Sequence, residues 1–122
     1  MDKKLLIIEE KDSLSKLLMP KLKDLPIQVI ETDTSEDGLK QALTDHPDLI
    51  LIEDMMTNMT GFLVLDKLRK DEWGIHVPVF FFADDVKYEG DIKSLSTNYE
   101  FFLKPAIMTD SLVLKIKQKL NV

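Results

Sequence analysis

The chain has 122 residues, of which 44% are hydrophobic, and this is the size of one globular domain built around one core. Its formal charge of −6 at pH 7 argues against direct nucleic-acid binding, and the absence of cysteine excludes disulfides and thiolate chemistry. Only four apolar residues separate Lys4 from Glu9, which is too short for a signal peptide or a membrane span, so we expect a cytoplasmic protein without membrane contact.

Short apolar runs alternate with segments of helical periodicity along the whole chain. The runs predict buried strands and are, in chain order, Leu5–Ile8, Ile27–Ile30, Leu49–Ile52, Val79–Phe82 and Phe101–Leu103. The helical patterns, in chain order, span 14–22, 39–43, 62–68 and 113–120, with start signals at Asp12 or Ser13, at Ser35 and at Thr109. Pro20 predicts that the first helix kinks or ends near it. Between the last two strands, residues 86–96 predict a short or irregular helix, because Gly90 and the serines weaken a helical pattern.

This alternation predicts an α/β fold, with one domain over residues 1–122. Strands and helices that alternate strictly form a parallel sheet with right-handed crossovers and helices on both faces. We therefore expect a five-stranded doubly wound sheet. In such sheets the reactive site lies beyond the carboxyl ends of the strands, so the residues that follow each apolar run are the candidates.

Acidic residues follow several of the predicted strands. The candidates are Glu9, Glu10, Glu53, Asp54, Ala83, Asp84, Asp85, Lys104 and Pro105. Carboxylates that lie close together repel, so this cluster needs a cation, a proton or Lys104 beside it. The plain alternative is that some of these side chains point into water and only end strands and loops.

The order of these segments resembles the receiver domain of bacterial response regulators over residues 4–120. The segments that carry the resemblance are Lys4–Glu10, Pro47–Glu53, Met55-Met56, Gly61, Val77–Val79 and Phe102–Pro105. The resemblance implies a flavodoxin-like sheet of order 2-1-3-4-5, a role in two-component phosphorelay signal transduction, and a signalling module rather than an enzyme. In that family an aspartate receives a phosphoryl group from a histidine kinase with Mg²⁺ bound nearby.

The resemblance assigns the family's functional roles to positions in this sequence, and most of these positions hold a different residue from the one the family uses. The phosphoacceptor position falls on Glu53, the switch hydroxyl on Ala83, the switch aromatic on Phe101 and the lysine on Lys104, and only Lys104 is the family's residue. The acidic pocket corresponds to Glu9, Glu10 and Asp54. Thr57 stands where the family usually has proline.

These departures predict a pseudo-receiver that is not phosphorylated at the usual position. Glutamate is longer than aspartate by one methylene, and attack on a phosphoryl group tolerates little misplacement. As a mimic of a phosphorylated aspartate, Glu53 has about one negative charge where a phosphoryl group has nearly two. Because Ala83 offers no hydroxyl, we expect instead that Lys104 pairs with Glu53 and fixes one conformation.

Three alternatives stay open at this stage. Mg²⁺ could be held by Glu10, Glu53 and the backbone carbonyl of Met55, although it demands near-ideal geometry. A one-residue shift in register would make Asp54 the acceptor of a competent receiver, but it would also turn the strand's side chains to the opposite face. The rim could also bind an unrelated small ligand, whose chemistry the sequence does not identify.

Protein partners are expected on the face formed by residues 86–96, the fifth strand and the last helix, which the resembled family uses for dimerisation and output. The candidate contact residues are Tyr88, Ile92, Tyr99 and Phe101. Exposed aromatic residues in this part of the chain favour a homodimer. His46 and His76 lack partners at an informative spacing and are predicted to be ordinary loop residues.

Overall fold

The computed structural model describes residues 2–86, 89–90, 98–104 and 109–122. Its helices and strands are, in chain order, β1 (Lys3–Ile8), α1 (Ser13–Leu22), β2 (Ile27–Thr32), α2 (Ser35–Asp45), β3 (Leu49–Glu53), α3 (Gly61–Arg69), β4 (Val79–Ala83), β5 (Tyr99–Leu103) and α5 (Thr109–Leu120). Most of the helix expected at 86–96 lies outside the described residues, including Tyr88 and Ile92, and Pro105 does too.

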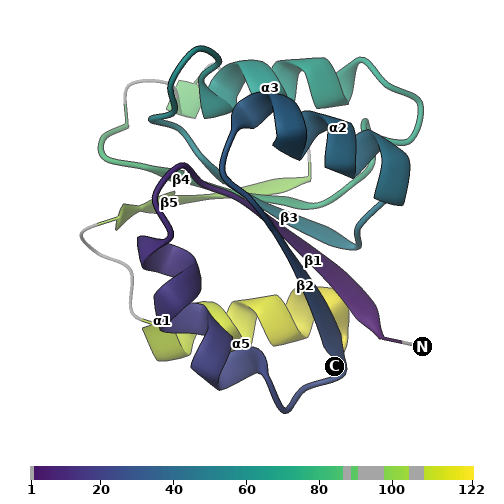
Figure 1. Ribbon diagram of the computed structural model, residues 1–122, viewed down its shortest axis with the longest axis vertical. Coiled ribbons are helices and arrows are strands. Elements are labelled where there is room, and N and C mark those ends of the chain that lie inside the picture. The colour runs from purple at the N-terminus through teal and green to yellow at the C-terminus, as the bar shows by residue number, and fades with distance from the viewer. Residues whose placement is uncertain (1, 87–88, 91–97, 105–108) are drawn as a thin grey trace.

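The strands form one parallel sheet of order β2-β1-β3-β4-β5 (Figure 1). The predicted doubly wound fold is therefore confirmed. β3 and β4 lie inside the sheet and are buried along their whole length, as their continuous apolar runs predict. β2 and β5 form the two edges of the sheet.

Alternate side chains of each central strand enter two separate apolar clusters, one on each face of the sheet. Leu6 and Ile8 of β1 pack with residues of α2 and α3, whereas Leu5 and Ile7 pack with residues of α1 and α5. Figure 1 shows the same division, with α2 and α3 above the sheet and α1 and α5 below it. Because side chains alternate along a strand, a continuous apolar run supplies both clusters at once.

Local signals set the ends of the helices. Thr34 and Thr60 accept hydrogen bonds from the backbone N–H groups of Asp37 and Leu63 and so cap α2 and α3. α1 contains Pro20 and ends at Leu22, close to the end that proline predicts. None of the helices in the described part of the chain is long and apolar enough to cross a membrane.

Arg69 joins three segments near the amino ends of β4 and β5. The residue is only 6% exposed, and its guanidinium donates to the carbonyls of Gly74, Val77 and Asn98 at 2.7, 2.8 and 2.9 Å. Burial lowers the pKa of Arg69 to about 10. The side chain therefore fixes the loop after α3 and the start of β5 to one another.

His46 takes the left-handed conformation at the end of α2 and stacks on Trp73, with ring centroids 4.4 Å apart. This contact joins the α2–β3 connection to the loop after α3. A packing contact of this kind is consistent with the predicted role of His46 as an ordinary loop residue.

Candidate functional site

The carboxyl ends of β1, β3, β4 and β5 bring the predicted residues to one edge of the sheet, which we call the rim. Because these strands are parallel neighbours, the residues that follow them meet there. The rim residues are Glu9 and Glu10 after β1, Glu53 and Asp54 at the end of β3, Ala83 at the end of β4, and Lys104 after β5.

Glu53 lies at the centre of the rim and is only 7% exposed. Its Oε2 pairs with Nζ of Lys104, and its Oε1 accepts a hydrogen bond from the backbone N–H of Glu10 at 3.2 Å. The predicted ion pair between Lys104 and Glu53 is therefore present. A buried carboxylate is tolerated when its oxygens are paired and hydrogen-bonded, as both are here.

Glu9 caps helix α1. Its carboxylate accepts hydrogen bonds from the N–H groups of Ser15 at 2.8 Å and Leu14 at 3.3 Å, while the side chain of Asp12 makes no cap contact. Burial raises the pKa of Glu9, and the hydrogen bonds from Ser15 and Leu14 oppose that rise. The sequence signals at Asp12 and Ser13 locate the start of this helix, but they do not reveal that Glu9 caps it.

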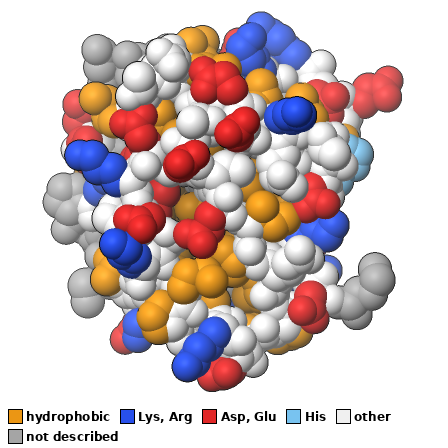
Figure 2. All heavy atoms as spheres, in the orientation of Figure 1, with side chains coloured by type: hydrophobic (Ala, Val, Ile, Leu, Met, Phe, Trp, Pro, Cys, Tyr) orange, Lys and Arg blue, Asp and Glu red, His pale blue; other side chains and the backbone are white. Residues whose placement is uncertain are grey.

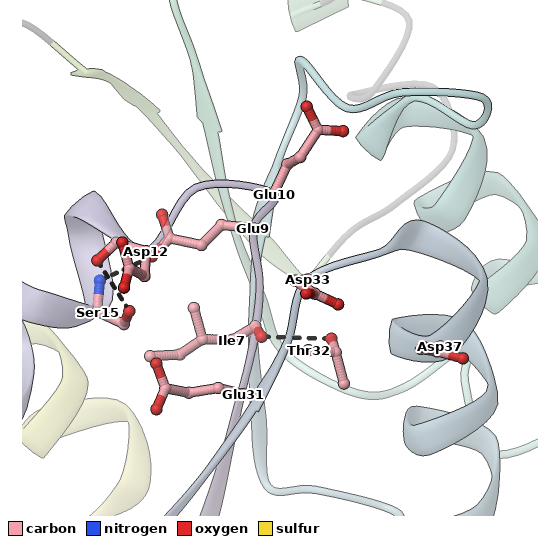
Figure 3. A pocket seen from close by; sticks show the side chains of 9 residues that line it. All are labelled: Ile7, Glu9, Glu10, Asp12, Ser15, Glu31, Thr32, Asp33 and Asp37. Carbon is pink, nitrogen blue, oxygen red and sulfur yellow. Dashed lines mark hydrogen bonds between the residues drawn. The ribbon is translucent and has the colours of Figure 1, made fainter.

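Glu10 reaches in another direction, toward the loop between β3 and α3. Its Oε1 accepts a hydrogen bond from the N–H of Thr57 at 2.7 Å. The hydroxyl and the N–H of Thr57 hold the pKa of Glu10 below its ordinary value. Figure 3 shows the Glu10 side chain pointing away from that of Glu9. The two neighbouring acids therefore bind different segments, Glu9 the start of α1 and Glu10 the β3–α3 loop.

Asp54 is buried at 5% exposure beneath the start of α3. Its Oδ1 has no hydrogen-bond partner among the residues that the structure describes. Burial raises the pKa of Asp54; the N–H of Phe62 opposes the rise, and the charges of Asp85 and Asp84 add to it. Sequence reasoning did not anticipate such deep burial of an aspartate.

The two positions to which the resemblance assigns the switch, 83 and 101, both hold apolar residues. Ala83 is 4% exposed and places a methyl group at the end of β4. Phe101 on β5 is half-buried, packs against the cluster beneath α2 and α3, and stacks on Phe81 with ring centroids 6.0 Å apart. A hydroxyl that could move toward a charged group at the rim is thus absent from position 83.

A cavity of about 380 Å³ opens beside the rim, between the carboxyl ends of β1 and β2 (Figure 3). Glu9 and Glu10 of the predicted acidic pocket line it, and Asp54 does not. Its lining residues are Ile7, Glu9, Glu10, Asp12, Ser15, Glu31, Thr32, Asp33 and Asp37. Figure 2 shows acidic side chains gathered on this face of the molecule. Glu53 and Lys104 do not line the pocket, so it is separate from the ion pair.

The arrangement of the rim carboxylates does not fit the Mg²⁺ site that the resemblance implies. Glu10 is directed to Thr57, and Glu53 is held by Lys104 and by the N–H of Glu10. Among the described residues, no three His, Asp or Glu side chains are grouped as ligands of one ion. Mg²⁺ is usually bound through one or two carboxylates in near-octahedral geometry, and here both candidate carboxylates already have donors of their own.

This chain belongs to the response regulator receiver domain family, whose profile matches residues 5–117. Among its relatives, the response regulator PleD of Caulobacter vibrioides is 35% identical over 82 residues, which is 65% of this chain and 17% of PleD. The alkaline phosphatase synthesis transcriptional regulatory protein PhoP of Bacillus subtilis is 33% identical over 72 residues, which is 59% of this chain and 30% of PhoP. The chain thus matches half or less of the length of these curated relatives.

Solved structures show the same fold. A response regulator structure from Chloroflexus aurantiacus superposes with a TM-score of 0.84 at 18% identity and covers 100% of both chains. The receiver domain of the sensor histidine kinase PA1611 from Pseudomonas aeruginosa, solved with a magnesium ion in its active-site cleft, has a TM-score of 0.82 at 15% identity over 100% of both chains. These identities are low, so the two structures support the fold alone.

Proposed function

We propose that this receiver domain signals by binding protein partners and is not phosphorylated at the usual position. The observation that carries the proposal is the buried carboxylate of Glu53, whose two oxygens are held by Lys104 and by the N–H of Glu10. Phosphoryl transfer needs a free oxygen in line with the incoming phosphorus atom, and a misplacement of about 1 Å is costly. At position 83 a methyl group stands where a hydroxyl would be needed to respond.

The test is incubation with acetyl phosphate and Mg²⁺ followed by intact mass, with a receiver that has an aspartate acceptor treated in parallel. We expect the control receiver to gain one phosphoryl group and this chain to keep its mass. The same result is expected for Asp54→Asn. An adduct on the natural chain that disappears in Asp54→Asn would instead establish a phosphorylatable receiver and defeat the proposal.

We also propose that the rim does not take up Mg²⁺ at physiological concentrations. The support is that the carboxylates of Glu10 and Glu53 already have donors, so the ion would have to displace these contacts. Calorimetric titration of Mg²⁺ into the natural chain checks this. The matched variant is Glu53→Asp, in which the carboxylate side chain is shorter by one methylene. Saturable heat from the natural chain that is lost in Glu10→Gln would contradict the proposal.

The partner surface that we propose includes β5, α5 and the segment 86–96. β5 is an edge strand, and its Tyr99 and Phe101 are half-buried while Leu103 is 36% exposed. An edge strand with partly exposed apolar side chains is a common place for another chain to pack. A second copy of this chain is the partner that we expect there.

Light scattering after size-exclusion chromatography tests this surface. We expect a concentration-dependent dimer in the natural chain and a monomer in Leu103→Lys, which places a charge on the edge at a side chain that is not in either core cluster. Leu43→Lys, at a comparable exposure of 38% on α2, is the control and should leave the dimer intact. A monomer at every concentration would contradict a homodimer.

A further inference from the structure

Consecutive contacts cross the rim from the end of β5 to the loop between β3 and α3. Lys104 pairs with Glu53, Glu53 accepts the N–H of Glu10 at 3.2 Å, and the carboxylate of Glu10 accepts the N–H of Thr57 at 2.7 Å. We infer that Lys104, Glu53, Glu10 and Thr57 act as one unit, a rim clamp that fixes the β1–α1 and β3–α3 loops without a metal ion.

Glu10 is the reason why these contacts belong together. Its backbone N–H donates to Glu53, while its own carboxylate accepts from Thr57. A movement of the Glu10 backbone away from Glu53 therefore also displaces the carboxylate that holds Thr57. Two contacts made by one residue are coupled when both depend on the position of its backbone, so we expect the loss of one to weaken the other.

The clamp also meets the electrostatic requirement of the rim. Carboxylates that are brought close together need positive charge or hydrogen-bond donors. Here Glu53 receives an ammonium and an N–H, and Glu10 receives the N–H and hydroxyl of Thr57, which together keep the pKa of Glu10 low. These donors come from the chain itself, so the two loops are held without a bound cation.

Thr57 contributes through its backbone as well as through its side chain. Its N–H is the donor at 2.7 Å, and proline at this position would remove both that N–H and the hydroxyl. Valine would remove the hydroxyl and leave the N–H in place. Thr57→Val and then Thr57→Pro therefore weaken the contact with Glu10 in two graded steps. The clamp does not depend on whether the proposed partner surface is correct.

The decisive experiment changes the inner end of the clamp, at Glu53 or Lys104, and measures amide hydrogen exchange at its outer end, Thr57. Glu53 makes no direct hydrogen bond to Thr57 among the described contacts, yet we expect Glu53→Met to speed amide hydrogen exchange at Thr57 roughly fivefold, which corresponds to a coupling of about 1 kcal/mol. Exchange is measured by NMR on the full chain. The amide of Leu51 in the buried strand β3 is read in the same spectra, so that global unfolding is recognised.

Asp48→Ala is the matched control. Asp48 accepts a hydrogen bond from the backbone N–H of Lys4 at 2.8 Å, at the end of β1 and β3 that lies away from the rim. Its replacement removes a hydrogen bond between a carboxylate and a backbone N–H, as Glu53→Met does, and should leave the exchange rate of Thr57 unchanged. Lys104→Met provides a second inner-end variant in case Glu53→Met does not fold, and it should also speed exchange at Thr57.

Two results would overturn the clamp. One is a Thr57 exchange rate that stays within about twofold of the natural chain in both inner-end variants while Glu10→Ala accelerates it, since the contacts would then be independent. The other is a change in Thr57 exchange when Mg²⁺ replaces EDTA, since the loops would then depend on a metal. The first result leaves the proposed function untouched. The second would also contradict the proposed absence of Mg²⁺ uptake, but neither result bears on the phosphorylation test, so failure of the clamp and phosphorylation of the chain are distinguishable.

Discussion

Replacing Lys104 by methionine removes the ammonium from the rim and leaves Glu53 charged and buried. The side chain of Glu53 is 8% exposed and that of Lys104 is 31% exposed. Removing one partner of a fully buried pair costs about 3–5 kcal/mol, whereas exposed pairs contribute about 0–1 kcal/mol. Because water still reaches the lysine end, we expect Lys104→Met to lower the free energy of unfolding by about 2 kcal/mol.

The double variant Lys104→Met/Glu53→Met completes a thermodynamic cycle. It removes both charges, so no buried carboxylate is left alone, and its free energy of unfolding should return to within about 1 kcal/mol of the natural chain. Urea denaturation at pH 7 and constant salt measures all variants. Lys115→Met is the control, because the pair of Lys115 with Glu100 is 43% and 40% exposed and should contribute less than about 0.5 kcal/mol.

The reasoning is refuted by either of two outcomes. If Lys104→Met changes the free energy of unfolding no more than Lys115→Met does, the contact of Lys104 with Glu53 has no more weight than a surface pair. If the double variant is destabilised by the sum of the two single effects, the residues act independently and Glu53 is not held by Lys104.

Three further predictions concern other residues. Arg69→Met should lower the free energy of unfolding by about 3 kcal/mol, because two buried carbonyls and one partly buried carbonyl lose a charged donor. Thermal unfolding that matches the natural chain would contradict this. Gly61→Ala should destabilise by more than about 2 kcal/mol in urea, since the added Cβ would lie 2.2 Å from the carbonyl oxygen of Glu53, whereas Gly90→Ala meets nothing within 4 Å and should be close to neutral. The folded state raises the pKa of Asp54 and so favours its protonated form, and the free energy of unfolding should therefore fall as pH rises from the ordinary aspartate pKa to the raised one. Asp54→Asn cannot ionise at this position, so it should gain stability relative to the natural chain over that pH interval. Parallel pH profiles of the two proteins would show the reasoning to be wrong.

Most of the fold was predictable from the sequence because both faces of the sheet are covered. Strands buried on both faces are apolar at nearly every position, with Glu53 at the end of β3 as an exception, and this makes β1, β3 and β4 easy to recognise. β5 begins at Tyr99, two residues before the predicted start at Phe101, because Glu100 interrupts the apolar run. Glu100 is accommodated at the sheet edge, where Lys115 of α5 pairs with it.

The site was predictable only as far as strand order determines it. The meeting of Glu53 with Lys104 follows from the neighbouring carboxyl ends of parallel strands. The cap that Glu9 provides to α1 and the contact of Glu10 with Thr57 depend on the paths of two loops, which no sequence period encodes. Arg69 was missed for a similar reason, since its partner carbonyl at Asn98 is 29 residues away along the chain.

The two ends of the sheet respond differently to dissolved salt. Near the amino ends of β4 and β5, the buried guanidinium of Arg69 binds backbone carbonyls, and mobile ions have little access to it. At the opposite end, Glu10 is exposed and Lys104 is partly exposed, so counterions can screen them over a Debye length of about 8 Å at physiological ionic strength. Rising salt should therefore weaken the contacts of the rim and leave those of Arg69 unchanged, which makes the loops at the carboxyl ends of the strands the ion-responsive part of the domain.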